Sequence, residues 1–293
     1  MADWIMLFAH NTGLLYGFVV LFALVVGSFL NVVIYRLPRM LDDAWRRECA
    51  ALTGREEATA PQGPRLSLAH PPSHCRHCGH RVCALENIPV LSYLALRGRC
   101  ASCGGRIGLR YPLVEIVTAL LSVLVVRRFG IGWEGVAALV LTWCLITLAA
   151  IDLDTWLLPD VITLPVLWLG LVLSLADWFT DSRSAILGAA LGYLGLWGLF
   201  HLFRLLTGKE GMGFGDFKLF AMLGAWLGWQ SLPQIVLLAA CAGALVGVGL
   251  ILVRKWDREL PIPFGPFLAA AGWIGLLWGD AINRAYLQWA GLV

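Results

Sequence analysis

Residues 14–35 read LLYGFVVLFALVVGSFLNVVIY and contain no Asp, Glu, Lys or Arg. The uncharged run already begins at Trp4 and has no basic segment before it. It is also longer than the apolar core of a cleaved secretory signal, which has about 7–15 residues. A membrane-spanning helix needs roughly 20 apolar residues, because the hydrocarbon core of a bilayer is about 30 Å thick. This stretch therefore predicts a transmembrane helix that is retained in the protein.

The whole chain has a membrane composition, since 59% of its residues are hydrophobic, 14% are charged and its mean hydropathy is +0.76. An ordinary soluble domain has about 25% charged residues. We therefore expect an all-α polytopic membrane protein. The length of a spanning helix predicts about eight spans, and six or seven are also defensible. They are placed at 14–35, 112–126, 133–151, 158–176, 185–206, 216–232, 234–253 and 264–279.

Positive charge is concentrated in one segment, because residues 36–112 hold 12 of the 22 Lys and Arg but only 6 of the 19 Asp and Glu. Segments rich in Lys and Arg stay on the cytoplasmic side of a membrane. We therefore expect a cytoplasmic insert at 36–111, between a first span at 1–35 and a membrane domain at 112–293. Eight spans then place Asp152 and Asp216 on the cytoplasmic side. Arg127 and Arg128 fall outside in this arrangement and count against it.

Two cysteine motifs lie in this insert, C-R-H-C-G at 75–79 and C-A-S-C-G at 100–104, with 21 residues between the two cysteine pairs. That spacing is close to the C-x2-C, 15–20 residue, C-x2-C pattern of structural zinc sites. Each motif places two thiolates on one turn, and the glycine that follows permits a positive φ. We predict a closed tetrahedral zinc site formed by Cys75, Cys78, Cys100 and Cys103.

There are two alternatives to this zinc site. The cysteines could hold no metal, either as a pair of disulfides or as unliganded thiols, or the metal could be bound by three cysteines and one histidine. A reducing cytoplasm disfavours disulfides.

Cys144 and Cys241 lie in predicted spans, where cysteine is usually a small packing residue. The residues 38–70 carry no interpretable motif, and we expect a loose connector there. The surplus donors near the motifs are His70, His74, His77, His80 and Cys83.

Two aspartates stand at the edges of predicted spans. Asp152 follows Ile151 at the end of the third span, and Asp216 closes the G-F-G-D sequence at 213–216. A carboxylate at the centre of a spanning helix costs about 2.5–3.5 kcal/mol, so such groups are functional candidates. Two close carboxylates share one proton, so one can act as a base on water and the other as an acid toward a carbonyl. This pattern predicts an aspartyl protease with Asp152 and Asp216 as its catalytic residues.

The other acidic residues have a simpler interpretation, which is that they cap helices or form ion pairs at the membrane surface. We assign Asp154 and Asp160 to this class, with Asp160 at a helix start after Pro159. Glu115 is expected to pair with an arginine of the insert. The candidate basic partners of the aspartates are Lys209, Lys218 and Arg204.

Two other functions compete with the protease. The first is a proton-coupled transporter in which Asp152 and Asp216 relay protons and the zinc module is structural. Such transporters have two related halves with paired broken helices, and the sequence shows no such symmetry. The second is a non-catalytic membrane scaffold with a zinc module for docking partners, which leaves the G-x-G-D sequence without an explanation.

Several motifs together resemble one family, the bacterial type IV prepilin peptidases, across almost the whole chain. They are G-S-F-L-N-V-V-I-Y-R-L-P at 27–38, E-N-I-P at 86–89, R-G-R-C at 97–100 and R-Y-P-L-V-E at 110–115. Asp152 and Asp216 match the two catalytic aspartates of the family, in its I-D and G-x-G-D contexts. Cys83 departs from the pattern, since an apolar residue is expected at that position.

The resemblance implies an enzyme of the inner membrane with two activities and a cytoplasmic zinc-binding domain. It removes the short basic leader of prepilins and pseudopilins, and it methylates the new N-terminus with S-adenosylmethionine. Gly98 is the candidate residue for methyl transfer on this resemblance alone. The sequence has no G-x-G-x-x-G motif that would indicate a Rossmann cofactor site. Its partners would be prepilins, pseudopilins and membrane lipid, with no nucleic acid, and the sequence predicts no oligomeric state.

Overall fold

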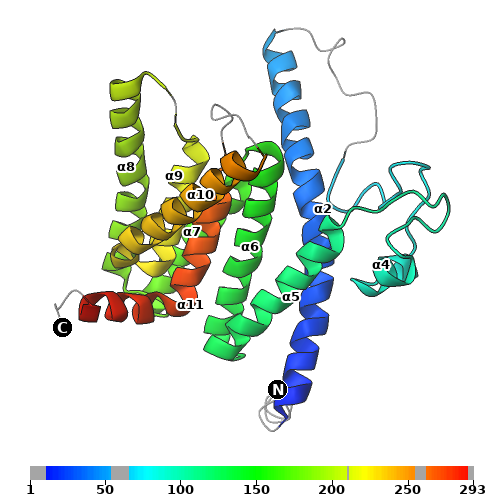
Figure 1. The fold of residues 1–293 in the computed structure, drawn as a ribbon, viewed down its shortest axis with the longest axis horizontal. Coiled ribbons are helices and arrows are strands. Elements are labelled where there is room, and N and C mark those ends of the chain that lie inside the picture. Colours follow the sequence, from blue (N-terminus) through cyan, green and yellow to red (C-terminus); the bar gives the residue numbers. More distant parts are fainter. Residues whose placement is uncertain (1–10, 54–65, 210, 255–261, 290–293) are drawn as a thin grey trace. The chain divides into compact units, whose positions relative to one another are not determined.

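The computed structural model describes residues 11–53, 66–209, 211–254 and 262–289 (Figure 1). These residues are mostly helical, and no β-strand occurs in the part of the chain that is described, only two isolated bridges. The expected all-α class is therefore confirmed. The chain divides into two compact units, one that ends at Arg127 and one that begins at Arg128.

The first unit contains two long helices, α2 (Thr12–Thr53) and α5 (Arg110–Phe129), and only the last two residues of α5 belong to the second unit. The insert between them carries a short 3₁₀ helix, η1 (Ala84–Asn87), and α4 (Leu91–Ala95). The two long helices come together at Gly27, where an added Cβ would lie 2.8 Å from the Cα of Glu115. A side chain at Gly27 would therefore push α2 and α5 apart.

The loose connector expected at 38–70 is wrong over its first part, because α2 continues without a break to Thr53. Pro38 lies inside this helix and removes one backbone donor without ending it. The polar residues beyond it include Asp42 and Arg46, which form an ion pair of 2.9 Å one helical turn apart. The residues 54–65 of the connector lie outside the described residues.

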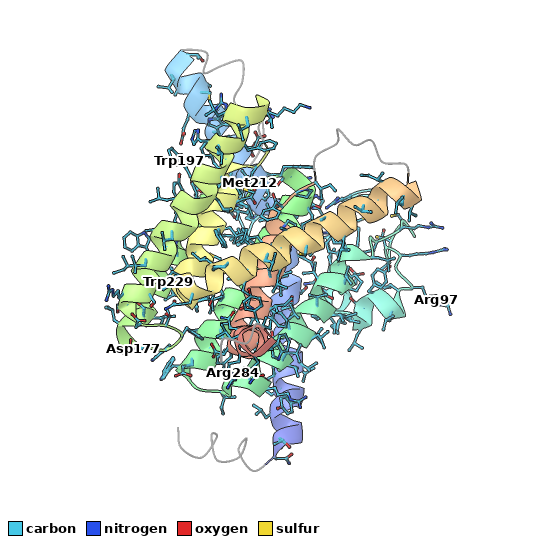
Figure 2. The ribbon with its side chains drawn as sticks, turned by 60° about the vertical axis from the view of Figure 1, so that its left-hand side comes forward. Arg97, Asp177, Trp197, Met212, Trp229 and Arg284 are labelled. Carbon is cyan, nitrogen blue, oxygen red and sulfur yellow. The ribbon has the colours of Figure 1, made fainter. Side chains whose placement is uncertain are left out.

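The second unit is a bundle of helices that contains α6 (Trp133–Thr155), α7 (Asp160–Leu173), α8 (Ser182–Thr207), α9 (Phe214–Leu227), α10 (Leu232–Arg254) and α11 (Gly265–Trp289). Two 3₁₀ turns, η2 (Ser174–Ala176) and η3 (Trp229–Ser231), join α7 to α8 and α9 to α10. In both views α10 runs at an oblique angle to α8, and Trp229 marks the turn before it in Figure 2.

The short helix α9 lies at the centre of this unit and packs against α7, α8 and α11. Its residues 219–226 are all buried. It approaches α8 most closely where Gly188 and Gly224 face each other, and a Cβ on either would strike the backbone of the other. Small residues are the usual means by which membrane helices pack closely. The sequence of α9 thus places Asp216, in its first turn, inside a tightly packed unit.

Five of the described helices are long and apolar enough to cross a membrane: Thr12–Thr53, Trp133–Thr155, Ser182–Thr207, Trp229–Val253 and Gly265–Gln288. These support the expected polytopic membrane protein. The spans predicted at 112–126, 158–176 and 216–232 correspond to α5, α7 and α9, which do not meet that standard. A count of eight spans is therefore not confirmed. The segment Asp160–Ala176 is apolar but shorter than a full span.

Candidate functional site

The two predicted catalytic aspartates lie in the second unit at the ends of two different helices. Asp152 lies in the last turns of α6, and Asp216 lies in the first turn of α9. Both side chains are buried, with 6% and 7% of their surface exposed, and Asp152 lies close enough for its charge to act on Asp216. Figure 1 shows the end of α6 and the starts of α9 and α11 at the same end of this unit. The fold thus brings together two carboxylates that are 64 positions apart in the sequence (216 − 152).

Asp216 is fixed by the G-x-G-D turn that precedes it. The backbone N–H of Gly213 donates to Oδ2 of Asp216 at 3.3 Å, which satisfies one of the free donors at the start of α9. A Cβ on Gly215 would lie 2.8 Å from the Cβ of Leu158, whereas a Cβ on Gly213 would meet only Asp216, at 3.8 Å. The second glycine of the motif is therefore required by packing, and the first is not.

Asp152 is held by a residue that sequence reasoning missed, Gly265. The backbone N–H of Gly265 donates to Oδ2 of Asp152 at 3.1 Å in a buried position. Gly265 opens α11, and the first N–H groups of a helix have no partner inside the helix and favour a negative charge. A Cβ at this position would lie 2.6 Å from the same oxygen. The available signal was the sequence P-F-G-P at 263–266, a glycine between prolines at a helix start.

Leu158 joins the supports of the two aspartates. It is 7% exposed, and its Cδ1 would lie 3.2 Å from a Cβ on Gly215 and 3.2 Å from a Cβ on Gly265. The side chain therefore packs between the backbone segments that carry or contact the two carboxylates. Two residues later, Asp160 opens α7 and forms an ion pair of 2.6 Å with Lys218 of α9. The structural interpretation of Asp160 is thereby confirmed.

The four predicted zinc ligands form one cluster in the insert of the first unit. One ligand atom from each of the four cysteines lies within 4.8 Å of the others, and the Sγ atoms of Cys75 and Cys103 are 3.8 Å apart. A tetrahedral zinc site with bonds of about 2.3 Å places its sulfurs about 3.8 Å apart. The cluster therefore fits a tetrahedral metal ion. Its members are Cys75, Cys78, Cys100 and Cys103.

Each pair of cysteines lies on a tight turn closed by a glycine. The N–H of Gly79 donates to the carbonyl of Cys75 at 2.9 Å, and the N–H of Gly104 donates to the carbonyl of Cys100 at 3.0 Å. Gly79 and Gly104 have φ angles of +73° and +67°, which confirms the positive φ predicted for them. The two turns are thus formed by local backbone bonds alone.

The thiols of this cluster differ in acidity. Backbone N–H groups of Cys78 and His77 lower the pKa of the Cys75 thiol to about 6. The backbone N–H of Gly105 lowers the pKa of the Cys103 thiol, but the neighbouring thiols, with Cys78 first, and burial together raise it to about 11. One thiolate therefore makes the next harder to form. A bound cation would remove that repulsion, as zinc does for its thiolate ligands.

Two of the surplus donors near the cluster, His74 and His80, have other contacts. His80 Nε2 lies 3.1 Å from Oε2 of Glu86, and His74 Nδ1 lies 3.2 Å from a backbone carbonyl. Cys83 is exposed and lies outside the metal-binding group. All eight cysteines are free, so the structure does not support the disulfide alternative. Among the described residues, the four cysteines form the metal-binding group, and no histidine belongs to it.

Polar residues at the crossing of α2 and α5 bind the insert. Glu115 is buried, accepts a 2.8 Å hydrogen bond from the backbone N–H of Val90, and accepts another from the hydroxyl of Ser28. Its described partners are therefore these two groups and not the arginine that was expected. Asn31 Nδ2 donates to the carbonyl of Tyr111 at 3.0 Å. Ser28 and Asn31 of the motif at 27–38 thus connect α2 to α5, and Glu115 of α5 connects both helices to the insert.

The end of the same motif contacts the loop before the cysteines. The guanidinium of Arg36, which is buried, donates to the carbonyl of Pro71 at 2.6 Å. The ring of Tyr35 has two guanidinium groups over it, Arg39 at 3.6 Å and Arg76 at 4.2 Å from the ring centroid. Such cation–π contacts are each worth about 0.5–1 kcal/mol where exposed. Arg76 belongs to the first cysteine motif, so the contact ties that motif to α2.

Gly98, the candidate for methyl transfer, has a structural explanation of its own. Its φ is +67°, and its N–H donates to the carbonyl of Tyr93 at 2.8 Å. A Cβ at this position would lie 2.7 Å from the hydroxyl oxygen of Tyr93. Backbone conformation and packing therefore require glycine here without any ligand. A role for Gly98 in methyl transfer stays a prediction.

Comparison with known proteins places the two units in one family. Residues 21–129 match the bacterial peptidase A24 N-terminal domain, and residues 139–248 match the type IV leader peptidase family. A prepilin leader peptidase/N-methyltransferase of Aeromonas hydrophila is 55% identical over 280 residues, which are 95% of this chain and 96% of the relative. This chain belongs to the type IV leader peptidase family. The prepilin leader peptidase/N-methyltransferase of Pseudomonas aeruginosa is 53% identical over 272 residues, 93% of each chain.

The family assignment agrees with the division of the chain into two units. The N-terminal domain match ends within two residues of Arg127, the last residue of the first unit (129 − 127). The leader peptidase match contains both Asp152 and Asp216. No solved structure matches the chain significantly. The resemblance stated from the motifs is confirmed, and the transporter alternative has no support among the relatives.

Proposed function

We propose that this chain removes the leader peptide of type IV prepilins with Asp152 and Asp216 and then methylates the new N-terminus. The observation that carries the proposal is the buried carboxylate pair, in which Asp152 lies close enough for its charge to act on Asp216. The relatives that match nearly the full chain are named prepilin leader peptidase/N-methyltransferase, which supports both activities.

The chemistry proposed for the pair is hydrolysis of a peptide bond by an activated water. One aspartate is ionised and removes a proton from water, whose oxygen adds to the scissile carbonyl carbon, while the other, protonated, donates to the carbonyl oxygen. The C–N bond then breaks, and the leaving amine takes up a proton. The products are the leader with a new carboxylate and the mature protein with a new amine. The two carboxylates titrate as a pair, so neither role belongs permanently to one residue.

The backbone around the pair supports this role. The N–H of Gly265 binds one oxygen of Asp152, and the N–H of Gly213 binds one oxygen of Asp216, so each carboxylate has one oxygen held by the fold. Each can direct its other oxygen toward water or substrate. Positioned groups of this kind reduce the reorganisation needed during a reaction. We propose Gly265 as a positioning residue for Asp152.

We propose that the four cysteines bind zinc and that the zinc is structural. Four sulfur ligands form a closed shell with no open position for water or substrate. The residues that would hold it are those of the cluster, and their sulfur spacing of 3.8 Å between Cys75 and Cys103 supports this ion. The bound ion would join the two cysteine turns and so stabilise the insert.

The proposed methyl donor is S-adenosylmethionine, which supplies an electrophilic methyl group to the nitrogen of the new N-terminus. The protein must hold that amine in its neutral form, since only a free electron pair can accept the methyl group. We propose that methyl transfer takes place at the insert. The insert lies in the N-terminal family domain and outside the leader peptidase domain. Gly98 remains the candidate on family resemblance.

We further propose that the protein lies in the inner membrane with the basic insert and both aspartates facing the cytoplasm. The excess of Lys and Arg at 36–112 supports this orientation. A basic leader stays in the cytoplasm, while the apolar helix of a prepilin or pseudopilin enters the bilayer. The scissile bond then lies at the depth of the two aspartates. Membrane lipid would surround the exposed apolar helices.

The test is leader cleavage of a purified prepilin by the detergent-solubilised protein, with mass spectrometry to separate the cleaved and methylated products. Asp152→Asn and Asp216→Asn are each expected to slow cleavage by about 10²–10⁴-fold, the usual contribution of a general acid or base. Both are expected to methylate a prepilin that has already been cut. The matched control is Asp154→Asn, since Asp154 is exposed and lies in the same helix.

The result that contradicts the proposal is cleavage at the wild-type rate by either of the two variants. Asparagine keeps the size and the hydrogen-bond acceptor of aspartate but cannot accept or donate the transferred proton at pH 7. A variant that still methylates is folded, so its loss of cleavage is a loss of chemistry and not of structure. If Asp154→Asn slows cleavage as much as Asp152→Asn, then cleavage depends on the negative charge in this region and not on the aspartate pair.

A further inference from the structure

The insert exposes a group of large apolar side chains at its short helix α4. Leu91 and Leu94 are three positions apart in α4, and each has 64% of its surface exposed. Leu85 and Ile88, which precede α4, are exposed as well. We call these four residues the leucine patch. Apolar side chains that gather on a surface mark a binding site for another molecule or for a membrane.

The other side of α4 is fixed to the rest of the insert. Tyr93 is half-buried, and its hydroxyl donates to the carbonyl of Ile107 at 3.4 Å. The carbonyl of Tyr93 accepts a 2.8 Å hydrogen bond from the N–H of Gly98. Residues three positions apart share one face of a helix, and residues two apart do not. The contacts of Tyr93 therefore hold Leu91 and Leu94 outward.

The position of α4 along the first span is set by one hydrogen-bonded chain. The N–H of Val90 donates to Glu115 of α5 at 2.8 Å, and Glu115 accepts another bond from Ser28 of α2. Ser28 lies eight positions before Arg36 (36 − 28), the first charged residue after the uncharged run. Eight helical residues rise about 12 Å. The start of α4 is therefore bound well inside the apolar part of α2, and Figure 1 shows α4 level with the middle of that helix.

The two long helices expose apolar side chains at this same level. Phe29 follows Ser28 in α2 and is exposed, and Leu113 and Ile116 lie on either side of Glu115 in α5 and are exposed too. On a helix that crosses a membrane, such side chains face the acyl chains of lipids. The surroundings of the leucine patch are therefore apolar.

Arginines follow the leucine patch directly. Arg97 and Arg99 come within five positions of Leu94 (99 − 94) and are exposed, and Figure 2 shows Arg97 at the outer edge of the insert. Residues 66–111 contain six arginines and one acidic residue, Glu86. A guanidinium group binds phosphate through two parallel hydrogen bonds, and basic segments beside a membrane are attracted to its anionic lipids.

We propose that the leucine patch enters the surface of the bilayer, where its leucines contact the upper acyl chains and Arg97 and Arg99 bind the phosphates of anionic lipids. An interfacial helix buries its apolar face about 5–10 Å into the boundary between headgroups and acyl chains. The bond from Val90, about 12 Å along α2 from Arg36, places α4 near this boundary. A free phosphate ion would satisfy the arginines but not the leucines. This inference concerns the insert and does not depend on the proposed peptidase activity.

The test uses the full chain in nanodiscs that contain phosphatidylglycerol with a diazirine in the upper part of its acyl chain. Illumination attaches the lipid to neighbouring side chains, and mass spectrometry of tryptic peptides locates it. Trypsin releases the leucine patch in one peptide, 82–97. This peptide is expected to carry lipid. The peptide 48–55 is expected to carry none, because its Leu52 lies 16 positions beyond Arg36 (52 − 36), about 24 Å away from the apolar run.

The leucines are tested with a variant that combines Leu91→Ser and Leu94→Ser, which is expected to lose most of the lipid on peptide 82–97. Leu52→Ser is the matched control, since Leu52 is also an exposed leucine of the first unit, and it is expected to change nothing. Limited proteolysis of the insert checks that both variants are folded. If the double variant does not fold, the wild-type peptides still decide the question.

The arginines are tested with a variant that combines Arg97→Gln and Arg99→Gln, in which trypsin releases peptide 82–106 instead. The measurement is the ratio of label from phosphatidylglycerol to label from phosphatidylcholine. One basic residue near an anionic surface favours it by about 5-fold, so the double variant is expected to lower the ratio by about 5–30-fold.

Three results overturn the proposal. The first is a peptide 82–97 that carries no more lipid than peptide 48–55, which would place the patch in water. The second is lipid label that the double leucine variant does not reduce, which would mean that lipid reaches the peptide away from the patch. The third is label that a saturating prepilin displaces completely, which would assign the patch to a protein substrate and not to the bilayer.

Discussion

The cysteine cluster of the first unit and the aspartate pair of the second unit are built in opposite ways. The cluster comes from one stretch, 75–103, in which two turns close themselves through bonds from Gly79 and Gly104. The aspartate pair depends on three helices, because Asp152 lies in the last turns of α6, Asp216 lies in the first turn of α9 and the N–H that binds Asp152 opens α11. We propose that a bound ion joins the two turns of the first site, whereas the second site depends on the packing of three helices.

Removal of the proposed zinc ion is therefore expected to have the largest effect, and this effect is expected only in the first unit. Structural zinc contributes about 10–16 kcal/mol to the folding of zinc-finger peptides, so a chelator or Cys100→Ser is expected to unfold the insert. Hydrogen exchange is expected to accelerate for the amides of Gly79 and Gly104 and to stay unchanged for those of α9. Mass spectrometry of the zinc-loaded protein gives the metal content.

Cys83→Ser is the control for this experiment, since Cys83 is exposed, lies in the same insert and is not part of the cluster. It is expected to retain both zinc and slow exchange. If chelation accelerates exchange in α9 as strongly as in the insert, then the two sites are not independent, and the contrast between them is wrong.

The two glycines of the G-x-G-D sequence test the other half of the comparison, in which packing supports the acid pair. Gly215→Ala is expected to destabilise the protein by about 1–3 kcal/mol, because the added methyl group overlaps Leu158. It is also expected to lower cleavage by displacing Asp216. Gly213→Ala is expected to be nearly neutral, since its φ is −83° and its Cβ has space. Thermal unfolding in detergent and kcat/KM measure both effects.

Equal effects of the two substitutions would contradict this account. They would mean that both glycines act through the substrate, which approaches the backbone, and not through Leu158. A Leu158→Ala, Gly215→Ala double variant separates these cases, because removal of the leucine side chain makes room for the added methyl group. Partial recovery of cleavage is expected.

This difference also explains how much the sequence could predict. Cysteine spacing is local, so the four sulfurs and the positive φ of both glycines were predictable from two short motifs. The place of Asp152 and Asp216 at the edges of apolar spans also made both predictable as candidates, and their catalytic role stays a prediction. Gly265 was not, because it lies 113 positions after Asp152 and no periodic pattern connects them. Contacts of that kind follow from helix packing.

The helix boundaries show the same limit. The end of the first span was placed at the first charged residue, but α2 continues through Arg36 and Pro38 to Thr53. A hydropathy pattern reports where the membrane ends and not where the helix ends. Likewise α9 has the apolar composition of a span because other helices enclose it, although it has only 14 residues.

Glu115 gives an intermediate effect, because it is a buried carboxylate in the first unit that relies on packing and not on the metal. Glu115→Ala leaves the N–H of Val90 and the hydroxyl of Ser28 without their acceptor, which costs about 1–3 kcal/mol for a buried group. Glu115→Gln keeps one carbonyl oxygen and is expected to retain most of the stability. Limited proteolysis of the insert measures both, and an equal loss in the two variants would mean that the negative charge is needed.

The smallest effect is expected at the ion pair between Asp160 and Lys218. Lys218 lies only two positions after Asp216 in α9. The two side chains are 51% and 29% exposed, and exposed pairs contribute about 0.2–1 kcal/mol. Asp160→Asn is therefore expected to lower the free energy of unfolding by less than about 1 kcal/mol and to leave kcat/KM nearly unchanged. High salt should remove even this difference, because it screens the pair in the parent protein. A loss of cleavage as large as that in Asp216→Asn, and independent of salt, would instead place Asp160 among the residues that act on the substrate, and the reactive pair would then have to be redefined.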